Sequence, residues 1–134
     1  MRTLAENHTT DVWGTWFGWT LHRNTGAAFG LAAHSPVPLQ IFATSLTLVL
    51  AVWWIRVLRK PAGSFESLEA AALALILGGS VGNLTDRFAF GAVIDFIDFK
   101  VWPIFNCADI AISIGAVIWA LCVVFGRRGQ QGSA

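Results

Sequence analysis

The sequence is poor in charged residues and has no tyrosine. Only 13% of its 134 residues are charged and 55% are hydrophobic, whereas ordinary globular chains carry about 25% charged residues. This composition favours lipid over water as the surroundings of the chain. The net charge is +1 and the basic residues form no stripe, so we expect no nucleic-acid partner. Because 134 residues leave no length for a second domain, we expect one membrane domain over residues 1–134.

Cysteine and histidine are too few and too scattered for several kinds of site. Cys107 and Cys122 fall in one expected helix, roughly 22 Å apart at 1.5 Å per residue, so they cannot pair. Neither has the neighbouring His or Cys of a zinc site. Ser80 and Ser113 have no nearby histidine, since His8, His22 and His34 all lie in the N-terminal loop. We therefore expect neither a metal nor a serine nucleophile.

Three apolar stretches are long enough to be transmembrane helices. They are residues 39–58, the Gly-rich residues 68–84, whose small side chains suit helix packing, and residues 103–125. Seven tryptophans are typical of anchoring at the lipid headgroups, where indole rings concentrate. The fold class we expect is an all-α integral membrane helix bundle with three spans.

The basic residues predict the orientation of these spans. Three lie between the first two spans and two follow the third, so both groups face the same side, which the positive-inside rule makes cytoplasmic. These residues are Arg56, Arg59, Lys60, Arg127 and Arg128. Residues 126–134 are then a cytoplasmic tail, and residues 1–36 are extracytoplasmic.

The N-terminal segment poses a topological problem, because nothing in residues 1–36 resembles a signal peptide or an anchor. Val12–Leu21 is apolar but too short to span a bilayer. Its alternation is typical of a strand lying on the membrane surface. We expect that a transmembrane helix preceding Met1 is missing from this chain.

Asp109 is the one formal charge in the third span. An ionised aspartate in such a helix costs at least about 2.5–3.5 kcal/mol, which indicates a functional reason for its presence. Asn106, three residues earlier, is expected on the same helical face. Asp95 and Asp98 lie in a loop among large apolar residues, and such surroundings raise a carboxyl pKa by desolvation.

Asp95 and Asp109 are both expected at the outer membrane surface, where they could meet. Two adjacent carboxyls in an apolar site share a proton, so one serves as general base and the other as general acid. Such a pair can hydrolyse a peptide bond with water. The residues alone leave a second possibility equally open: a small ion-coupled carrier with Asp109 as its ion or proton site.

Two further polar groups carry possible chemistry. Asn24 belongs to a turn of small residues, whose simplest interpretation is a loop. Asn83, Asp86 and Arg87 share one helix face at the end of the second span. A contact of Asp86 with Arg87 or Asn83 that closes the helix end is an equal alternative to a functional role.

Four blocks of the chain resemble the lipoprotein signal peptidases (signal peptidase II), which are bacterial aspartic endopeptidases of the inner membrane. The blocks are RNTGAAFG at Arg23–Gly30, GGSVGNLTDR at Gly78–Arg87, VIDFIDF at Val93–Phe99 and FNCADIAISIGA at Phe105–Ala116. They follow the order and spacing of that family. The resemblance implies that Asp95 and Asp109 are catalytic, and that Asp98 is not. It also implies a set of residues that support the site or bind substrate: Asn24, Asn83, Asp86, Arg87 and Asn106.

The resemblance further implies the substrate and the setting of the enzyme. The substrate is a prolipoprotein whose cysteine carries diacylglycerol, and the cut falls just before that cysteine, without metal or cofactor. The family has four transmembrane helices and a small extracytoplasmic β-sheet, with the active site on the extracytoplasmic side. Its first helix bears an Asp-Gln-x-Thr-Lys pattern that is absent here. We expect a monomer in contact with membrane lipid.

Overall fold

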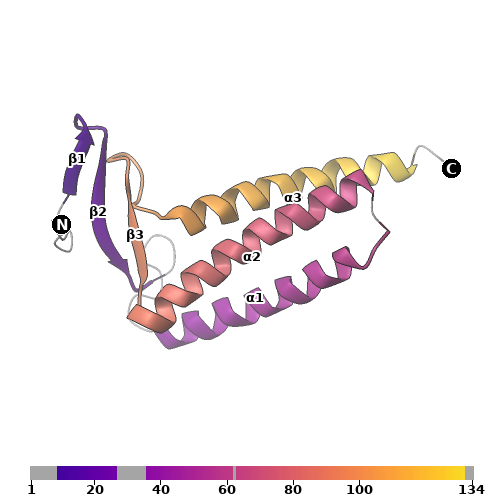
Figure 1. Ribbon diagram of the computed structural model, residues 1–134, viewed down its shortest axis with the longest axis horizontal. Coiled ribbons are helices and arrows are strands. Elements are labelled where there is room, and N and C mark those ends of the chain that lie inside the picture. Colours follow the sequence, from indigo (N-terminus) through magenta and orange to yellow (C-terminus); the bar gives the residue numbers. More distant parts are fainter. Residues whose placement is uncertain (1–8, 27–35, 62, 132–134) are drawn as a thin grey trace. The chain divides into compact units, whose positions relative to one another are not determined.

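The computed structural model describes residues 9–26, 36–61 and 63–131. Their elements are β1 (Thr9–Trp13), β2 (Phe17–Asn24), α1 (Pro36–Leu58), α2 (Ser64–Phe90), β3 (Val93–Asp98) and α3 (Cys107–Gln131) (Figure 1). The chain divides into two compact units. The sheet unit holds the described residues up to Ala43 together with Gly82–Cys107, and the helix unit holds Thr44–Val81 and the described residues from Ala108 onward.

Strands β1 and β2 form an antiparallel hairpin in which Trp13 pairs with Phe17. Gly14 starts the turn with a φ of 55°, a left-handed conformation that glycine adopts without a steric cost. The Trp16 N–H donates to the Trp13 carbonyl at 3.3 Å and closes the turn. The interpretation of Val12–Leu21 as one strand is therefore wrong, because Gly14 lets the chain reverse within that segment.

Strand β3 completes an antiparallel sheet in the order β1-β2-β3. Its other edge is bonded to Phe105: the Ile97 N–H donates to the Phe105 carbonyl at 2.8 Å, and the Phe105 N–H donates to the Ile97 carbonyl at 3.1 Å. The expectation that Asp95 lies in a loop is wrong, since Val93–Asp98 is a strand bonded on both sides. Phe105 is held in this bridge, and α3 begins only at Cys107 instead of at Pro103.

A glycine connects α2 to β3. Gly91 has a φ of 74°, and its N–H donates to the Arg87 carbonyl at 3.0 Å. This is a common way of ending a helix, in which a left-handed glycine caps a free carbonyl of the last turn. Helix α2 therefore runs through the polar residues of its last turns to Phe90, beyond the expected residue 84. Asn83, Asp86 and Arg87 are thus held on helix immediately before β3.

The helix unit is held by close backbone approach and by tryptophan contacts. A Cβ atom added to Gly115 of α3 would lie 2.6 Å from the Ala72 carbonyl oxygen of α2, and one added to Gly79 would lie 2.7 Å from Ile112 Cγ1. The rings of Trp53 and Trp119 meet edge to face with centroids 5.1 Å apart. Close approach through small residues is typical of helices that pack in lipid, where apolar contact alone offers little advantage.

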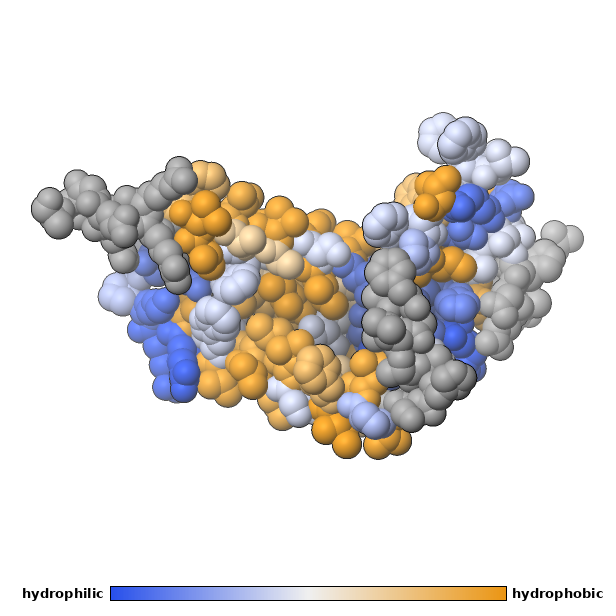
Figure 2. Space-filling view, turned by 180° about the vertical axis from the view of Figure 1, so that it is seen from behind, coloured by the Kyte–Doolittle hydropathy of each residue, from blue (hydrophilic) through white to orange (hydrophobic). Residues whose placement is uncertain are grey.

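Most of the large apolar side chains of the helices are exposed. Figure 2 shows apolar residues over much of the helical surface on the face in view, and Ile41 and Phe42 of α1 are 63% and 65% exposed. Three helical segments among the described residues are long and apolar enough to cross a membrane: Val37–Leu58, Glu66–Phe90 and Cys107–Phe125. They lie where the three spans were expected, with bounds that differ by a few residues.

Candidate active site

Asp95 is the centre of a polar group inside the sheet unit. It lies in the middle of β3 with 1% of its surface exposed. Asn24 Nδ2 donates to Asp95 Oδ2 at 3.0 Å, and Asn106 Nδ2 donates to Asp95 Oδ1 at 2.9 Å. A buried carboxylate needs such donors, because its transfer out of water is otherwise costly. Each oxygen of Asp95 thus accepts a hydrogen bond from a side-chain amide.

Asn106 connects Asp95 to helix α2. It is 4% exposed, and its Nδ2 also donates to Asn83 Oδ1 at 3.0 Å. One amide nitrogen therefore bonds both partners with its two hydrogens. Because α3 starts at Cys107, Asn106 precedes the helix, and the expectation that it shares a helical face with Asp109 is wrong. The Asn106 amide instead donates to Asp95 and Asn83, which both belong to the sheet unit.

The orientation of the Asn24 amide is fixed from its other end. The Gly26 N–H donates to Asn24 Oδ1 at 3.1 Å, a side-chain turn that asparagine commonly forms two residues ahead. With its oxygen engaged in this way, Asn24 presents its nitrogen to Asp95. Residues 27–30 of the same block lie outside the described residues.

Asp86 and Arg87 connect the last turns of α2 to neighbouring backbone. Asp86 Oδ2 accepts the Ile94 N–H at 3.0 Å, and Arg87 Nη2 donates to the Gly26 carbonyl at 3.2 Å. The first bond holds the start of β3 and the second holds the turn after β2. The structure thus gives Asp86 a backbone partner in the strand that carries Asp95, where the sequence suggested Arg87 or Asn83.

Asp109 belongs to the helix unit and lies in the first turn of α3. A carboxylate at this end of a helix is favoured by the helix dipole. Asp109 lies three residues after Asn106 in the sequence, and Asn106 donates a hydrogen bond to Asp95. The pairing of Asp95 with Asp109 stays a prediction.

Asp98 differs from the expectation of a raised carboxyl pKa. Burial acts to raise its pKa, but bonds from the Thr20 hydroxyl and from the Lys100 backbone and side chain outweigh burial, so the pKa of Asp98 is lowered. The Thr20 hydroxyl donates to Asp98 Oδ2 at 2.7 Å, and Lys100 Nζ donates to the same oxygen at 3.1 Å. Asp98 is therefore held as an anion, and its exclusion from catalysis stays a prediction.

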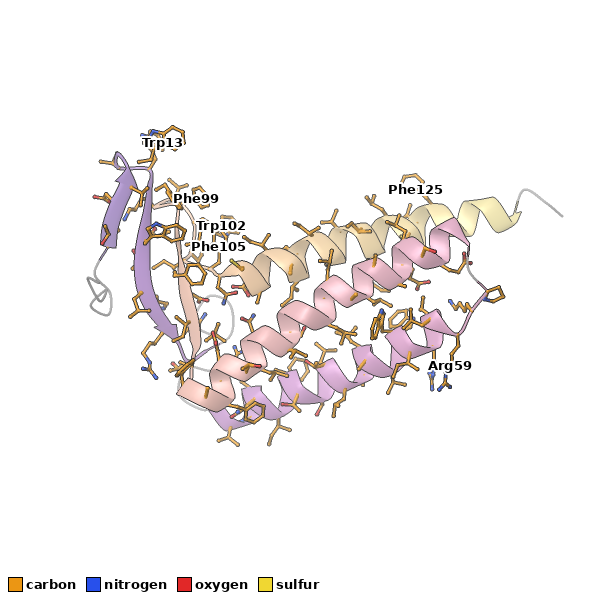
Figure 3. The ribbon with its side chains drawn as sticks, viewed as in Figure 1. Trp13, Arg59, Phe99, Trp102, Phe105 and Phe125 are labelled. Carbon is orange, nitrogen blue, oxygen red and sulfur yellow. The ribbon has the colours of Figure 1, made fainter. Side chains whose placement is uncertain are left out.

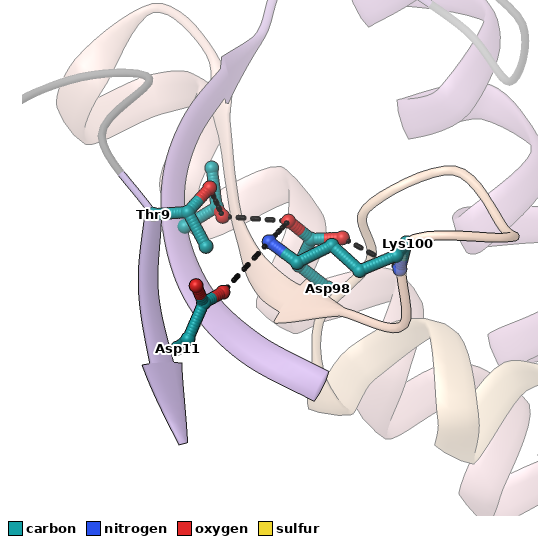
Figure 4. Close-up of polar contacts among 5 residues, drawn as sticks. Thr9, Asp11, Asp98 and Lys100 are labelled. Atoms are coloured by element: carbon teal, nitrogen blue, oxygen red, sulfur yellow. Dashed lines mark hydrogen bonds and ion pairs between the residues drawn. The ribbon is translucent and has the colours of Figure 1, made fainter. Parts of the chain in front are cut away.

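Asp98 is part of a polar lock that ties all three strands together and that the sequence did not reveal. Lys100 Nζ also lies 3.4 Å from Asp11 Oδ1 on β1. The Thr20 hydroxyl is 2.7 Å from that of Thr9 (Figure 4). These contacts join residues far apart in the sequence, so no local pattern could have predicted them.

His22 is a second residue whose position the sequence missed. The sequence predicts a loop at His22, but His22 lies in β2 opposite Asp95 in the sheet register. Directly opposite residues of antiparallel strands share a face and have close Cβ atoms.

In the described ranges, no group of three or more His, Cys, Asp and Glu residues is arranged to hold a metal ion, and Cys107 and Cys122 are free thiols.

Comparison with known proteins gives one consistent result. Residues 1–125 match the family model described as signal peptidase (SPase) II. The lipoprotein signal peptidase of Moorella thermoacetica is 39% identical over 127 residues, which are 93% of this chain and 81% of that protein. The lipoprotein signal peptidase of Pseudomonas fluorescens is 46% identical over 114 residues, which are 78% of this chain and 64% of that protein.

Two solved structures of bacterial membrane enzymes are also similar to the chain. Both are 28% identical, with TM-scores of 0.74 and 0.73. They cover 90% and 92% of this chain, and the chain covers 73% and 79% of theirs. Together with its three long apolar helices, these relatives make the protein a multi-pass membrane protein. The chain belongs to the signal peptidase II family.

Proposed function

We propose that the protein is an aspartic endopeptidase that removes the signal peptide of prolipoproteins. Its substrate carries diacylglycerol on a cysteine, and the cut falls just before that cysteine. One observation carries the proposal: Asp95 is almost fully buried and is bonded at both oxygens by amides from two of the family-like blocks. Membership of a peptidase family, together with a buried and oriented carboxyl group, favours hydrolysis of the peptide bond by acid–base catalysis.

The proposed reaction uses Asp95 and Asp109 as a pair that shares one proton. The ionised member takes a proton from water as the oxygen attacks the peptide carbonyl, while the protonated member donates a hydrogen bond to the carbonyl oxygen. Collapse of the tetrahedral intermediate then breaks the C–N bond, and the leaving nitrogen receives a proton from the pair. No cofactor enters any of these steps.

The supporting residues hold Asp95, one member of the proposed pair. Asn24 and Asn106 orient the carboxyl plane of Asp95, and Asn83 fixes the Asn106 amide. Asp86 and Arg87 fix the backbone at Ile94 and Gly26. Pre-positioned groups of this kind lower the barrier, because they do not have to reorganise during the reaction.

The setting of the proposed reaction follows from charge and substrate. With the basic residues on the cytoplasmic side, both acids face the extracytoplasmic side of the bacterial inner membrane. The diacylglycerol of the substrate then lies in the outer leaflet beside them. We propose that the enzyme works as a monomer in contact with lipid.

The test is cleavage of a purified diacylglyceryl prolipoprotein, followed as a mobility shift on a gel. We expect cleavage by the unmodified chain in lipid bilayers, and loss of cleavage in Asp109→Asn and in Asp95→Asn. The unlipidated precursor is the substrate control and should stay uncut. The ion-coupled carrier is not favoured by the family assignment; ion-gradient-dependent flux in vesicles without any processing would establish it and overturn the peptidase.

A further inference from the structure

An aromatic surface extends from the hairpin turn to the start of α3. We name its outer part, Trp13, Trp16, Val101 and Trp102, the aromatic tip. Its members are 81%, 74%, 80% and 64% exposed. Single exposed apolar residues are ordinary, but a group of three indoles and a valine indicates a surface that meets something apolar.

Packed rings of Phe17, Phe99 and Phe105 connect the hairpin to the segment that carries Val101 and Trp102. Trp13 pairs with Phe17 across the hairpin, and the rings of Phe17 and Phe99 have centroids 5.1 Å apart. Phe99 in turn stacks on Phe105 at 5.9 Å. Figure 3 shows Trp13 at the end of the hairpin and Phe99, Trp102 and Phe105 between it and the start of α3. The hairpin turn and the β3–α3 segment therefore form one continuous surface.

The backbone is strained where it presents Val101 and Trp102. Lys100 has a φ of 60°, and the Val101 N–H donates to the Phe99 carbonyl at 2.6 Å. A three-residue turn with positive φ at a non-glycine residue is rare and strained. Asp98 holds this turn, because its Oδ1 accepts the Lys100 N–H at 2.9 Å and its Oδ2 binds Lys100 Nζ. The fold thus maintains an unfavourable turn that leaves two apolar side chains exposed.

The tip is remote from Asp95 along the sheet. His22, opposite Asp95, and Phe17, opposite Trp13, are separated on β2 by five steps of the chain, or about 16 Å at 3.3 Å per residue. The exposed apolar side chains of the tip therefore call for an occupant other than a group bound directly at Asp95.

Continuity with a membrane span identifies that occupant. Phe105 is hydrogen-bonded to β3. Two residues later, at Cys107, a helix begins that is long and apolar enough to cross a membrane. The aromatic surface thus ends where a membrane span begins. Indole is the side chain that concentrates in the headgroup layer, with its ring in the acyl boundary and its N–H in contact with polar groups.

We propose that the aromatic tip inserts into the headgroup–acyl boundary of the lipid bilayer and anchors the sheet on the membrane surface. The anchor is a lipid-binding surface distinct from the site at Asp95, and it does not depend on the proposed reaction. It fixes the height of the sheet, and so of Asp95, relative to the bilayer.

The seven tryptophans supply their own reporters for a test. The full chain is labelled with 5-fluorotryptophan, reconstituted in phosphatidylcholine nanodiscs, and each fluorine signal is assigned by a single Trp→Phe variant. Broadening is then measured with a doxyl-labelled phosphatidylcholine and, separately, with a water-soluble gadolinium chelate. Trp53, on the span-like part of α1, is the internal reference for contact with lipid.

We expect the signals of Trp13, Trp16 and Trp102 to broaden with the doxyl lipid at least half as strongly as that of Trp53. Broadening by gadolinium alone would place the tip in water and overturn the proposal. Broadening by neither probe would mean that protein, such as a second copy of the chain, covers the tip, and would overturn it equally. Contact that appears only after a diacylglyceryl peptide is added would make the tip a substrate surface and would also refute the anchor.

A charge variant gives an independent readout. Trp16→Asp should reduce the doxyl broadening of the Trp13 signal by at least about twofold, because a carboxylate is excluded from the acyl boundary. Trp16→Phe is the matched control and should keep it. Unchanged lipid contact of Trp13 in Trp16→Asp would contradict the anchor.

Discussion

The contacts that stabilise the sheet unit internally differ in kind from those that stabilise the helix unit. In the sheet unit the buried polar residues include Thr20, Asp95, Asp98 and Asn106, and hydrogen bonds join them to residues of other segments. In the helix unit the buried residues are mainly apolar, and glycines bring α2 and α3 close together. Hydrogen bonds fix the orientation of side chains, whereas close apolar packing fixes the distance between helices. Polar contacts therefore position the candidate site, while small residues set the spacing of α2 and α3.

The same contrast recurs between two acids of one strand. Asp98 is bonded by a hydroxyl, a backbone N–H and an ammonium group. Asp95, three residues earlier, accepts bonds from the amides of Asn24 and Asn106. Asp98 has a lysine partner, which favours its anionic form, whereas two amide donors fix the orientation of the Asp95 carboxyl plane. The first arrangement suits a structural lock, and the second suits the role proposed for Asp95.

The largest expected effect separates these two acids directly. Asp95→Asn should lower kcat for the diacylglyceryl prolipoprotein by about 10³-fold, since it removes one member of the proposed acid–base pair. Asp98→Asn should change kcat by less than about tenfold, because its partners are structural. Both are measured in bilayers at equal amounts of folded protein. Equal losses in the two variants would remove the distinction between them.

A second prediction concerns the amides that hold Asp95. Asn106→Ala removes the donor shared by Asp95 and Asn83, and should lower kcat by about 10- to 100-fold, since a lost bond to a charged group costs about 1.5–3 kcal/mol. Asn24→Ala removes one donor to Asp95 and should cost less. A larger loss in Asn24→Ala would show that Asn106 is not the main orienting group.

A third prediction tests the helix unit. Gly79→Ala and Gly115→Ala should each destabilise the protein by about 1–3 kcal/mol, because the added methyl meets backbone or side-chain atoms of the facing helix. Gly78→Ala is the matched control: its Cβ would meet nothing within 4 Å, so it should be neutral or stabilising by up to about 1 kcal/mol. Unfolding by SDS titration measures all three. A destabilised Gly78→Ala would contradict the assignment of close approach to the other two positions.

Much of the fold could be predicted from local patterns. Each of the three helices lies over an expected apolar stretch, because length and hydropathy act locally along the chain. The bounds were less predictable. Gly91 ends α2 only because its φ is positive, and Phe105 stays out of α3 because it bonds to Ile97. Neither cause is visible in hydropathy.

The candidate site was predictable in composition and less so in geometry. The motif blocks named Asn24, Asp95 and Asn106, and the structure brings these three together. The polar lock of Asp11, Thr20 and Lys100 was missed, because it depends on strand order and register. Sequence distance gives no signal for a bond between Thr20 and Asp98.

The smallest expected effect is a pH dependence that arises from Asp98. Its pKa in the folded state lies below the ordinary value of 3.8, so the unfolded chain binds a proton more readily than the folded one. The contribution of Asp98 to stability is therefore complete above pH 3.8 and is lost as the pH falls through the lowered pKa. At neutral pH we expect Asp98→Asn to be less stable than the unmodified protein by about 1 kcal/mol, the net value of one hydrogen bond.

The measurement is thermal unfolding of both proteins between pH 7 and pH 2, followed by tryptophan fluorescence. The stability difference between them should stay constant down to about pH 4 and shrink below it, because a protonated Asp98 resembles asparagine in charge. Asp11→Asn is the control: this acid is largely exposed, with 60% of its side chain accessible, and a surface ion pair contributes little. A difference that stays constant down to pH 2 would mean that the Asp98 lock depends on the shape of its side chain and not on its charge. The contrast with Asp95 would then rest on hydrogen-bond geometry alone.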